Sequence, residues 1–200
     1  MRRSAPACAV FCGSRTPASA VARRSVRAFG GHLAVRGVDL LYGAVDRGVM
    51  RMVARAARER GGRVVGFTTR SLHAAGLTPA DLAELHIARS LSARKAAILR
   101  RADFAVVLPG GVGTLDELFE ALALIETGAI RMPVGVLNVG RYYNPIRMQM
   151  EIGERAGLVN PRTASQVLFE TSPRRLIDRL LAAAGAPALS SNSLKKDSAI

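Results

Sequence analysis

Short apolar runs alternate with longer amphipathic segments along this chain. The short runs are rich in β-branched residues, as buried strands are, and cover residues 7–12, 38–42, 63–67, 84–88, 103–108, 133–139 and 166–169. The segments between them repeat apolar residues at helical spacing and cover residues 17–36, 48–60, 91–101, 114–127, 144–156 and 173–184. Strands that alternate with helices in this way form βαβ units. We therefore predict an α/β fold, a doubly wound parallel sheet in three α/β/α layers.

One domain accounts for the whole pattern. Gly128 closes a predicted helix, and Pro133 and Pro161 mark connections between segments. A length of 200 residues fits a single domain, which we place at residues 1–186. Residues 187–200 are mostly polar, and we expect them to form a disordered tail that carries no chemistry.

The composition is that of a folded protein outside the membrane. Hydrophobic residues make up 49% of the chain and charged residues 22%, and the mean hydropathy is +0.17. No run approaches the roughly 18 uninterrupted apolar residues of a membrane span. The apolar run after Met1 ends at Cys12 without the long apolar region of a signal peptide, so we interpret it as the first strand. We expect a soluble, cytoplasmic protein with no membrane partner.

The charge balance favours an anionic partner. The chain carries 29 Lys and Arg against 15 Asp and Glu, a formal net charge of +14. Three of these cations are lysines, Lys95, Lys195 and Lys196, and the arginines are spread along the chain, as a GC-rich coding bias would spread them. With no Trp and 4% aromatic residues, the chain offers little for base stacking. A small anionic molecule is therefore favoured, and a DNA-binding module remains an alternative that rests on charge alone.

The cysteines and histidines predict no metal site. Cys8 and Cys12 fall on one face of the first strand, too far apart along it for a disulfide. We expect them to be buried free thiols in a reducing cytosol. His32, His73 and His86 show no ligand spacing. The sequence therefore indicates no metal and no cofactor.

The strongest motif is a glycine loop at residues 109–114, which reads Pro-Gly-Gly-Val-Gly-Thr. It follows a buried strand and precedes a helix, where backbone N–H groups and the helix dipole favour a phosphate. No Lys precedes Thr114, so this is not a Walker A loop, and Asp116 stands where the third glycine of GxGxxG belongs. The loop fits one phosphate, in a nucleoside monophosphate or sugar phosphate, and the alternative is a tight turn without a ligand.

Glu117 has two interpretations. Thr114 to Glu117 reads as a capping box, in which the glutamate only returns a hydrogen bond to the backbone. The apolar residues Leu115, Leu118, Phe119 and Leu122, however, form a helical stripe that leaves Asp116 and Glu117 beside the glycine loop. Two carboxylates next to an anion site favour a functional role.

The helix before the loop carries two cations on its inward stripe. Arg94 and Lys95 fall between Leu91 and Ile98, which define that stripe. A cation on a buried face needs an anionic partner. Either a salt bridge to Asp116 or Glu117 supplies it, or a ligand does at the carboxyl edge of the sheet, where doubly wound folds bind ligands.

Taken together, these motifs resemble the LOG family of cytokinin riboside 5′-monophosphate phosphoribohydrolases over residues 7–184. The matching segments, in chain order, are FCGS at 11–14, LYG at 41–43, RKA at 94–96, PGGVGTLDE at 109–117, VGVLN at 134–138 and YY at 142–143. The resemblance implies a Rossmann-like fold, a homodimer, and Arg94 and Glu117 as the catalytic pair. It also implies that the glycine loop, with Gly110, Gly111, Gly113 and Thr114, holds the nucleotide phosphate. From their charge and position we add Lys95 and Asp116 to the predicted substrate-binding residues.

Some positions depart from the family pattern. Ala44, Val45 and Arg51 stand where the family has glycines, Ala93 replaces a glutamate, and Gly76 replaces another that often contacts substrate. We expect these changes to alter base specificity or to lower activity.

The resemblance implies hydrolysis of the N-glycosidic bond of a nucleoside 5′-monophosphate, either a cytokinin riboside 5′-monophosphate or AMP, to free base and ribose 5-phosphate. Glu117 suits stabilisation of an oxocarbenium-like state or activation of water, with Arg94 on the departing charge and Lys95 attracting phosphate. A lysine decarboxylase that uses pyridoxal phosphate needs a lysine within the fold to form a Schiff base with the cofactor. Lys95 is the only candidate, and we reject this function. A non-catalytic nucleotide or molybdenum-cofactor carrier remains the alternative, and the presence of both Arg94 and Glu117 favours the enzyme.

Overall fold

A computed structural model describes residues 5–185 of the chain, and these form one seven-stranded parallel sheet with helices on both faces. The strands are β1 (Ala7–Phe11), β2 (Asp39–Tyr42), β3 (Val64–Thr69), β4 (Glu84–Ala88), β5 (Phe104–Val107), β6 (Val134–Leu137) and β7 (Val167–Glu170). The helices are α1 (Ala20–Val35), α2 (Gly48–Arg58), α3 (Arg70–Ala74), α4 (Leu91–Arg101), α5 (Val112–Glu126), α6 (Asn144–Arg155), α7 (Pro161–Ser165) and α8 (Pro173–Gly185), with a 3₁₀ turn η1 (Val139–Arg141). The predicted α/β class and its strands are confirmed, and the tail predicted at residues 187–200 lies outside the described residues.

The strand order creates a crevice beside β1. The order is β4-β3-β2-β1-β5-β6-β7, so the chain moves outward from β1 to β4 and then crosses to the other side of β1. Cys8 pairs with Phe104 and Phe11 with Val107, which brings the carboxyl ends of β1 and β5 to the same edge. Doubly wound sheets bind ligands at such a reversal of strand order.

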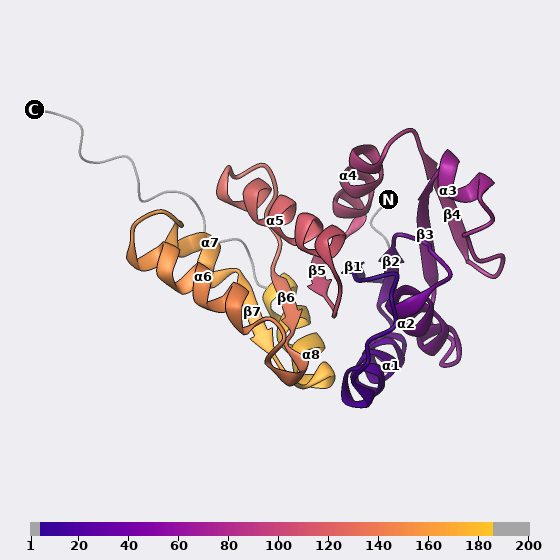
Figure 1. Cartoon of the computed structure of the whole chain (residues 1–200), viewed down its shortest axis with the longest axis horizontal. Coiled ribbons are helices and arrows are strands. Elements are labelled where there is room, and N and C mark those ends of the chain that lie inside the picture. The colour runs from indigo at the N-terminus through magenta and orange to yellow at the C-terminus, as the bar shows by residue number, and fades with distance from the viewer. Residues whose placement is uncertain (1–4, 186–200) are drawn as a thin grey trace, which may run out of the picture.

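Helices cover the two faces in separate groups. Figure 1 shows α1, α2 and α8 on one side of the sheet and α4 and α5 on the other, with α6 and α7 beside α5. Phe29, Val53 and Leu180 fill the core under the first group, and Ile98, Leu118 and Met150 fill the core under the second. The three predicted layers are therefore present.

Short and terminal pieces of the chain differ from the prediction. The predicted helix at 17–36 begins later, at Ala20, because the Ser19 side chain accepts a hydrogen bond from the Ala22 N–H at 3.3 Å and caps the helix there. The short elements α3, α7 and η1 were not predicted, since three to five residues are too few to show a period.

Both cysteines behave as predicted. Cys8 and Cys12 are buried, unbridged, and packed in the same core cluster on the α1, α2 and α8 side. Burial raises the pKa of each thiol, and the Glu117 carboxylate raises that of Cys12 further. Both groups are therefore kept as neutral thiols.

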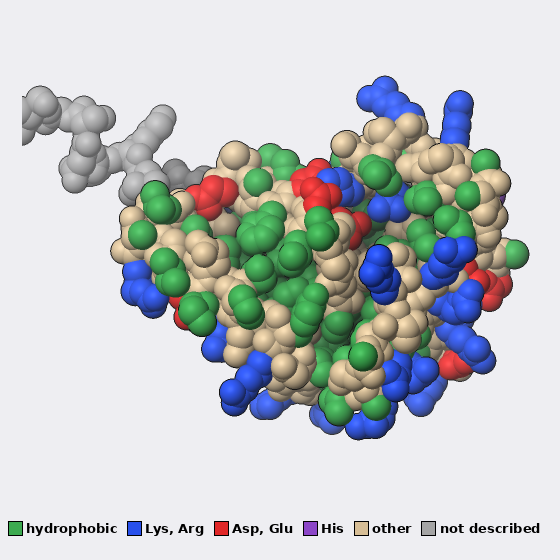
Figure 2. Space-filling view, in the orientation of Figure 1, with side chains coloured by type: hydrophobic (Ala, Val, Ile, Leu, Met, Phe, Trp, Pro, Cys, Tyr) green, Lys and Arg blue, Asp and Glu red, His purple; other side chains and the backbone are tan. Residues whose placement is uncertain are grey.

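The surface divides into an apolar and a basic part. Figure 2 shows hydrophobic side chains gathered over α5 and α6, whereas Lys and Arg side chains crowd the edge formed by α1, α2 and α8. Phe119, Met148 and Ile152 are large apolar side chains exposed on α5 and α6. Within residues 5–185, no helix combines the length and the hydropathy that a membrane span would need.

Candidate functional site

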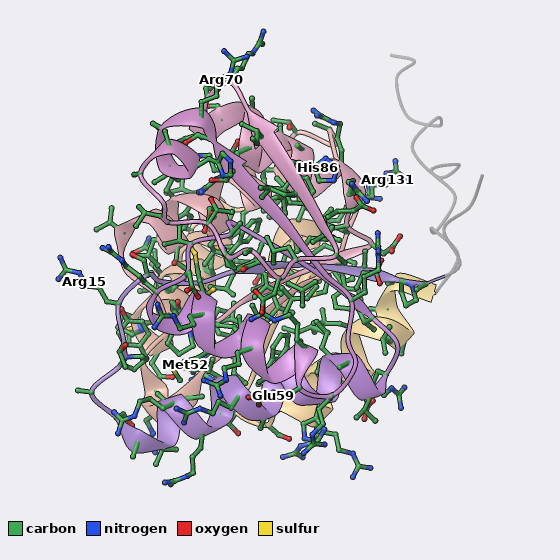
Figure 3. All side chains as sticks on the ribbon, turned by 90° about the vertical axis from the view of Figure 1, so that its right-hand side faces the viewer. Arg15, Met52, Glu59, Arg70, His86 and Arg131 are labelled. Carbon is green, nitrogen blue, oxygen red and sulfur yellow. The ribbon has the colours of Figure 1, made fainter. Side chains whose placement is uncertain are left out.

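A cavity of about 790 Å³ opens at the carboxyl edge of β1 and β5. Its lining joins the segment after β1, the start of α1, the starts of α4 and α5, and the η1 turn. Every residue that the sequence analysis assigned to the site lies on its wall: Arg94, Lys95, Gly110, Gly111, Gly113, Thr114, Asp116 and Glu117. Arg15 lies on the rim and points away from the body of the protein in Figure 3.

The glycine loop (residues 109–114) is shaped by close packing against the segment after β1. The Gly13 N–H donates to the Pro109 carbonyl at 3.3 Å. A Cβ atom on Gly110 would lie 2.1 Å from Thr114 Oγ1 and 2.8 Å from the Gly13 nitrogen, so no side chain fits there. Gly111 and Gly113 instead face open space. Two glycines thus leave room beside the start of α5, where an anion is favoured.

Two tyrosines hold this loop from the other side. The Tyr142 hydroxyl donates to the Gly110 carbonyl at 2.8 Å, and the Tyr143 hydroxyl donates to the Leu108 carbonyl at 2.8 Å. Asn138 fixes the second ring by accepting the Tyr143 N–H at 2.8 Å. In the sequence this tyrosine pair is part of the family resemblance but has no assigned role, and the available signal was its position shortly after β6, a strand that ends at the same edge.

The capping-box interpretation of Glu117 is wrong. The N-cap of α5 is Gly111 and the helix begins at Val112, two residues before the predicted start, because the Leu115 N–H already donates to the Gly111 carbonyl at 3.1 Å. Thr114 is inside the first turn and buried. Glu117 therefore lies in the second turn, beyond the reach of the cap, and its burial needs another explanation.

Glu117 faces Arg94 inside the cavity. Arg94 Nη2 lies 3.7 Å from Glu117 Oε1, and the two side chains are only 10% and 7% exposed. Arg94 Nη1 also donates to the Gly43 carbonyl at 3.3 Å, and its buried Nε finds no hydrogen-bond acceptor among the described residues. The guanidinium thus has a fixed position and spare donor capacity toward the cavity.

Burial dominates the ionisation of Glu117. It raises the pKa of this carboxyl to about 7, against the opposing effects of the Arg94 and Lys95 cations. A carboxyl that titrates near neutral pH can both give and take a proton under ordinary conditions. Perturbed groups of this kind in a cavity are typical of catalytic sites.

Lys95 binds two carboxylates of α5. Its Nζ lies 2.7 Å from Asp116 Oδ2 and also pairs with Glu120. Burial alone would lower the pKa of Lys95, but the hydrogen bonds to Asp116 and Glu120 outweigh it and raise that pKa. The predicted need of buried cations for anionic partners is therefore confirmed for both Arg94 and Lys95.

The inward stripe predicted for α4 is wrong at its first residue. Ile98 and Arg94 are buried, whereas Leu91 is 56% exposed at the mouth of the cavity. Ser90 caps the helix by accepting the Ala93 N–H at 3.1 Å, so Leu91 is the first helical residue and projects past the sheet edge.

Two of the three glycine replacements lie in the core, and the third, Arg51, lies at the surface outside the cavity. Ala44 and Val45 are buried in the core, and Arg51 is bonded to Asp46 at 3.0 Å. Ala44 adopts φ +51°, a left-handed conformation that strains any residue with a Cβ atom. In this segment, Met50 is the residue that reaches the cavity. None of these three replacements adds a side chain to the cavity wall, so they affect the packing around the cavity and not its surface.

Within residues 5–185, no three His, Cys, Asp or Glu side chains gather closely enough to hold a metal ion. The charged groups of the cavity are arranged as ion pairs between α4 and α5 instead.

Comparison with known solved structures agrees on the fold. The molybdenum cofactor binding protein of Rippkaea orientalis superimposes with a TM-score of 0.66 over 90% of this chain and 98% of its own, at 20% identity. The molybdenum cofactor carrier protein of Chlamydomonas reinhardtii gives a TM-score of 0.65 at 20% identity, over 90% of this chain and 99% of its own. At this identity the likeness shows the arrangement of the sheet and helices alone.

Sequence comparison identifies the family. A family model described as "Possible lysine decarboxylase" matches residues 50–180. The cytokinin riboside 5′-monophosphate phosphoribohydrolase LOG7 of Arabidopsis thaliana is 31% identical over 171 residues, which cover 86% of this chain and 79% of LOG7. The phosphoribohydrolase LOG of Oryza sativa is also 31% identical, over 86% of this chain and 71% of its own. This chain therefore belongs to the LOG family of phosphoribohydrolase-like proteins.

Proposed function

We propose that this protein hydrolyses the N-glycosidic bond of a nucleoside 5′-monophosphate and releases a purine-type base and ribose 5-phosphate. The observation that carries the proposal is the buried Arg94–Glu117 pair, which shares one cavity with the glycine loop. The names of the similar phosphoribohydrolases support the same reaction class.

The glycine loop is suited to hold the 5′-phosphate. Gly111 and Gly113 carry no side chain that would block close approach, and the N-terminal end of α5 attracts negative charge. Binding one phosphate here would fix the ribose at a set distance from Glu117, one turn further along the same helix. A nucleoside without the phosphate should therefore bind and react poorly.

Glu117 is suited to the chemical step. As the bond between the base and C1′ breaks, positive charge develops on the ribose, and an ionised carboxylate beside it lowers the energy of that state. Water adds its oxygen to C1′ and gives one proton to Glu117, while the base leaves with the electron pair of the broken C1′–N bond. The base then takes up one proton from solvent and Glu117 releases its proton to solvent, so one water is consumed in total. Arg94 can donate a hydrogen bond to the leaving base and stabilises its charge.

Part of the remaining wall is apolar and suits a base. Pro17, Ala22, Met50 and Leu91 lie on it, so either an unsubstituted adenine or an adenine with an apolar N6 substituent would find contacts. We propose AMP and cytokinin riboside 5′-monophosphates as the substrates to compare. No cofactor takes part in the proposed reaction.

The test is to incubate the protein with AMP, with its N6-isopentenyl derivative and with adenosine, and to measure free base and ribose 5-phosphate by chromatography. We expect release from the monophosphates and at least about tenfold slower release from adenosine. Equal turnover of adenosine and AMP would exclude the glycine loop as the phosphate site. Tight nucleotide binding without any base release would instead favour a non-catalytic carrier, the function named for the solved structures above.

We also propose that the protein acts as a homodimer. Phe119 on α5 and Met148 and Ile152 on α6 expose apolar surface on neighbouring helices, and a second copy could bury it. Part of this surface lies on α5, the helix that also carries Glu117.

The two buried thiols support a reducing compartment, and we propose the cytoplasm. Cys8 and Cys12 are unbridged, and disulfides are rare in that compartment.

A further inference from the structure

Three carboxylates crowd one stretch of α5. Asp116, Glu117 and Glu120 all lie near Arg94 and Lys95 in the first half of α4, and Glu117 and Glu120 are one turn apart. Like charges at this spacing repel one another along a helix. An ionised Glu117 inside the cavity therefore needs its two carboxylate neighbours neutralised.

Lys95 lies where it neutralises both. Its ammonium bonds to Asp116 Oδ2 at 2.7 Å and also pairs with Glu120, and the Lys95 side chain is only 13% exposed. Figure 2 shows acidic and basic side chains meeting where α4 faces α5. The ammonium donates a hydrogen bond to Asp116, and its charge also faces the carboxylate of Glu120. The Lys95 ammonium is thus already engaged in two ion pairs with α5.

We propose that Lys95 is a positioning residue, whose ammonium holds Asp116 and Glu120 as a neutralised pair and so keeps Glu117 in its ionised form for the reaction. This differs from the role predicted for Lys95 from the sequence, in which its charge attracts the substrate phosphate. The inference concerns the same site and rests on the proposed function only where turnover is measured.

The charged and titratable groups around Glu117 come from three elements. Helix α4 supplies Arg94 and Lys95, α5 supplies Asp116 and Glu120, and the Cys12 thiol follows β1. Arg94 and Lys95 favour the ionised form of Glu117, whereas Asp116 and Glu120 oppose it. Removing Lys95 takes away one favourable charge and also releases the two opposing ones.

The test follows the titration of Glu117 directly. The side-chain carboxyl carbons are labelled with ¹³C in all glutamates, and the Glu117 signal is assigned by its loss in Glu117→Gln. In Lys95→Met we expect the midpoint of the Glu117 titration to move up by about one pH unit or more. Lys95→Arg keeps the cation and should stay near the parent value. Arg100→Met is the matched control, because it removes an exposed cation from the same helix.

A second variant keeps the test decisive if Lys95→Met does not fold. The double variant Asp116→Asn with Glu120→Gln leaves Lys95 without its two partners, so the Glu117 midpoint should move in the opposite direction, to lower pH. A purely structural role of Lys95 would not produce shifts of opposite sign. Midpoints in Lys95→Met and in the double variant that match the parent would overturn the proposal.

Turnover gives an independent readout. In Lys95→Met the acidic limb of the profile of kcat/KM against pH should move up with the NMR midpoint, while KM for AMP at high pH stays within about twofold of the parent. A raised KM with an unchanged pH profile would make Lys95 a substrate ligand and overturn the positioning role. If no variant or parent releases base while the NMR midpoints shift as expected, the proposed reaction fails and the electrostatic role of Lys95 stands.

Discussion

Arg94 and Glu117 meet as a buried ion pair, 3.7 Å apart, although they lie on different helices and neither contacts the other through the backbone. Arg94 is in addition anchored to the Gly43 carbonyl at the end of β2. The Glu117 carboxylate is thus held in place by three parts of the fold: its own helix α5, Arg94 on α4, and, through Arg94, the segment after β2. Changes at either residue are expected to act on the other.

Replacing Glu117 by Gln separates catalysis from structure. The amide keeps the size of the side chain but removes the charge beside the developing oxocarbenium, so we expect kcat to fall about 100-fold or more. Nucleotide affinity, measured by calorimetry, should survive, because the glycine loop is unchanged. Glu126→Gln, an exposed carboxylate further along the same helix, is the control and should keep parental turnover. Parental activity in Glu117→Gln would make this carboxylate purely structural.

The same substitution should change how stability depends on pH. Because the pKa of Glu117 is raised to about 7 in the folded protein, from an ordinary value of 4.5, the folded state binds this proton more tightly than the unfolded state. The contribution of Glu117 to stability is therefore most favourable below about pH 4.5 and becomes less favourable as the pH rises toward 7. Between pH 5 and pH 8 the parent should lose about 2 kcal/mol of unfolding free energy that Glu117→Gln does not lose. Urea titrations at both pH values measure this, and parallel curves for the two proteins would contradict it.

Two glycines of the loop should respond differently to alanine. Gly110→Ala would place a Cβ atom 2.1 Å from Thr114 Oγ1, so we expect a loss of about 2 kcal/mol or more in stability. Gly111→Ala meets no atom within 4 Å and has a φ of −98°, so the fold should be nearly unaffected. Its methyl group occupies the space of an approaching phosphate, and KM for AMP should rise about tenfold. Unchanged KM in a well-folded Gly111→Ala protein would place the phosphate elsewhere.

The apolar surface on α5 and α6 predicts the effect of a charge introduced there. Phe119→Asp should turn a species of twice the 21.2 kDa chain mass into a monomer, as measured by light scattering at micromolar concentration. Val35→Asp is the matched control, because Val35 is an exposed apolar residue on α1 in the opposite layer, and it should remain dimeric. A monomeric parent protein, or equal masses for both variants, would contradict the proposed dimer.

The strands could be predicted because a buried parallel strand has few acceptable compositions. All seven lie within two residues of the ranges predicted from their short apolar runs, as in β5, where every residue is buried. The residues of the candidate site could be picked out because clustered glycines, neighbouring carboxylates and cations on an inward helix face are unusual in a helix and its preceding loop; their roles stay predictions. Their presence in one cavity follows from the sheet topology.

The predictions that failed concern backbone geometry, which the residue types alone do not specify. Because α5 begins at Val112 and not at Thr114, with Gly111 as an N-cap that has no side-chain hydrogen bond, Glu117 lies in the second turn and cannot close a capping box. The stripe of α4 failed at Leu91, since periodicity does not tell where a helix passes the edge of its sheet. The hydroxyl bonds of Tyr142 and Tyr143 join residues more than 30 positions apart, so the position of the pair after β6 was the one hint in the sequence and did not identify the acceptors.

The tyrosine bonds have a thermodynamic consequence. Because Tyr142 and Tyr143 fasten the carbonyls of Gly110 and Leu108 from within the fold, the conformational freedom of the loop is lost during folding and not when a nucleotide arrives. Association should then show only the small negative heat-capacity change expected from the area that the nucleotide itself buries, without the larger change that accompanies the ordering of a segment.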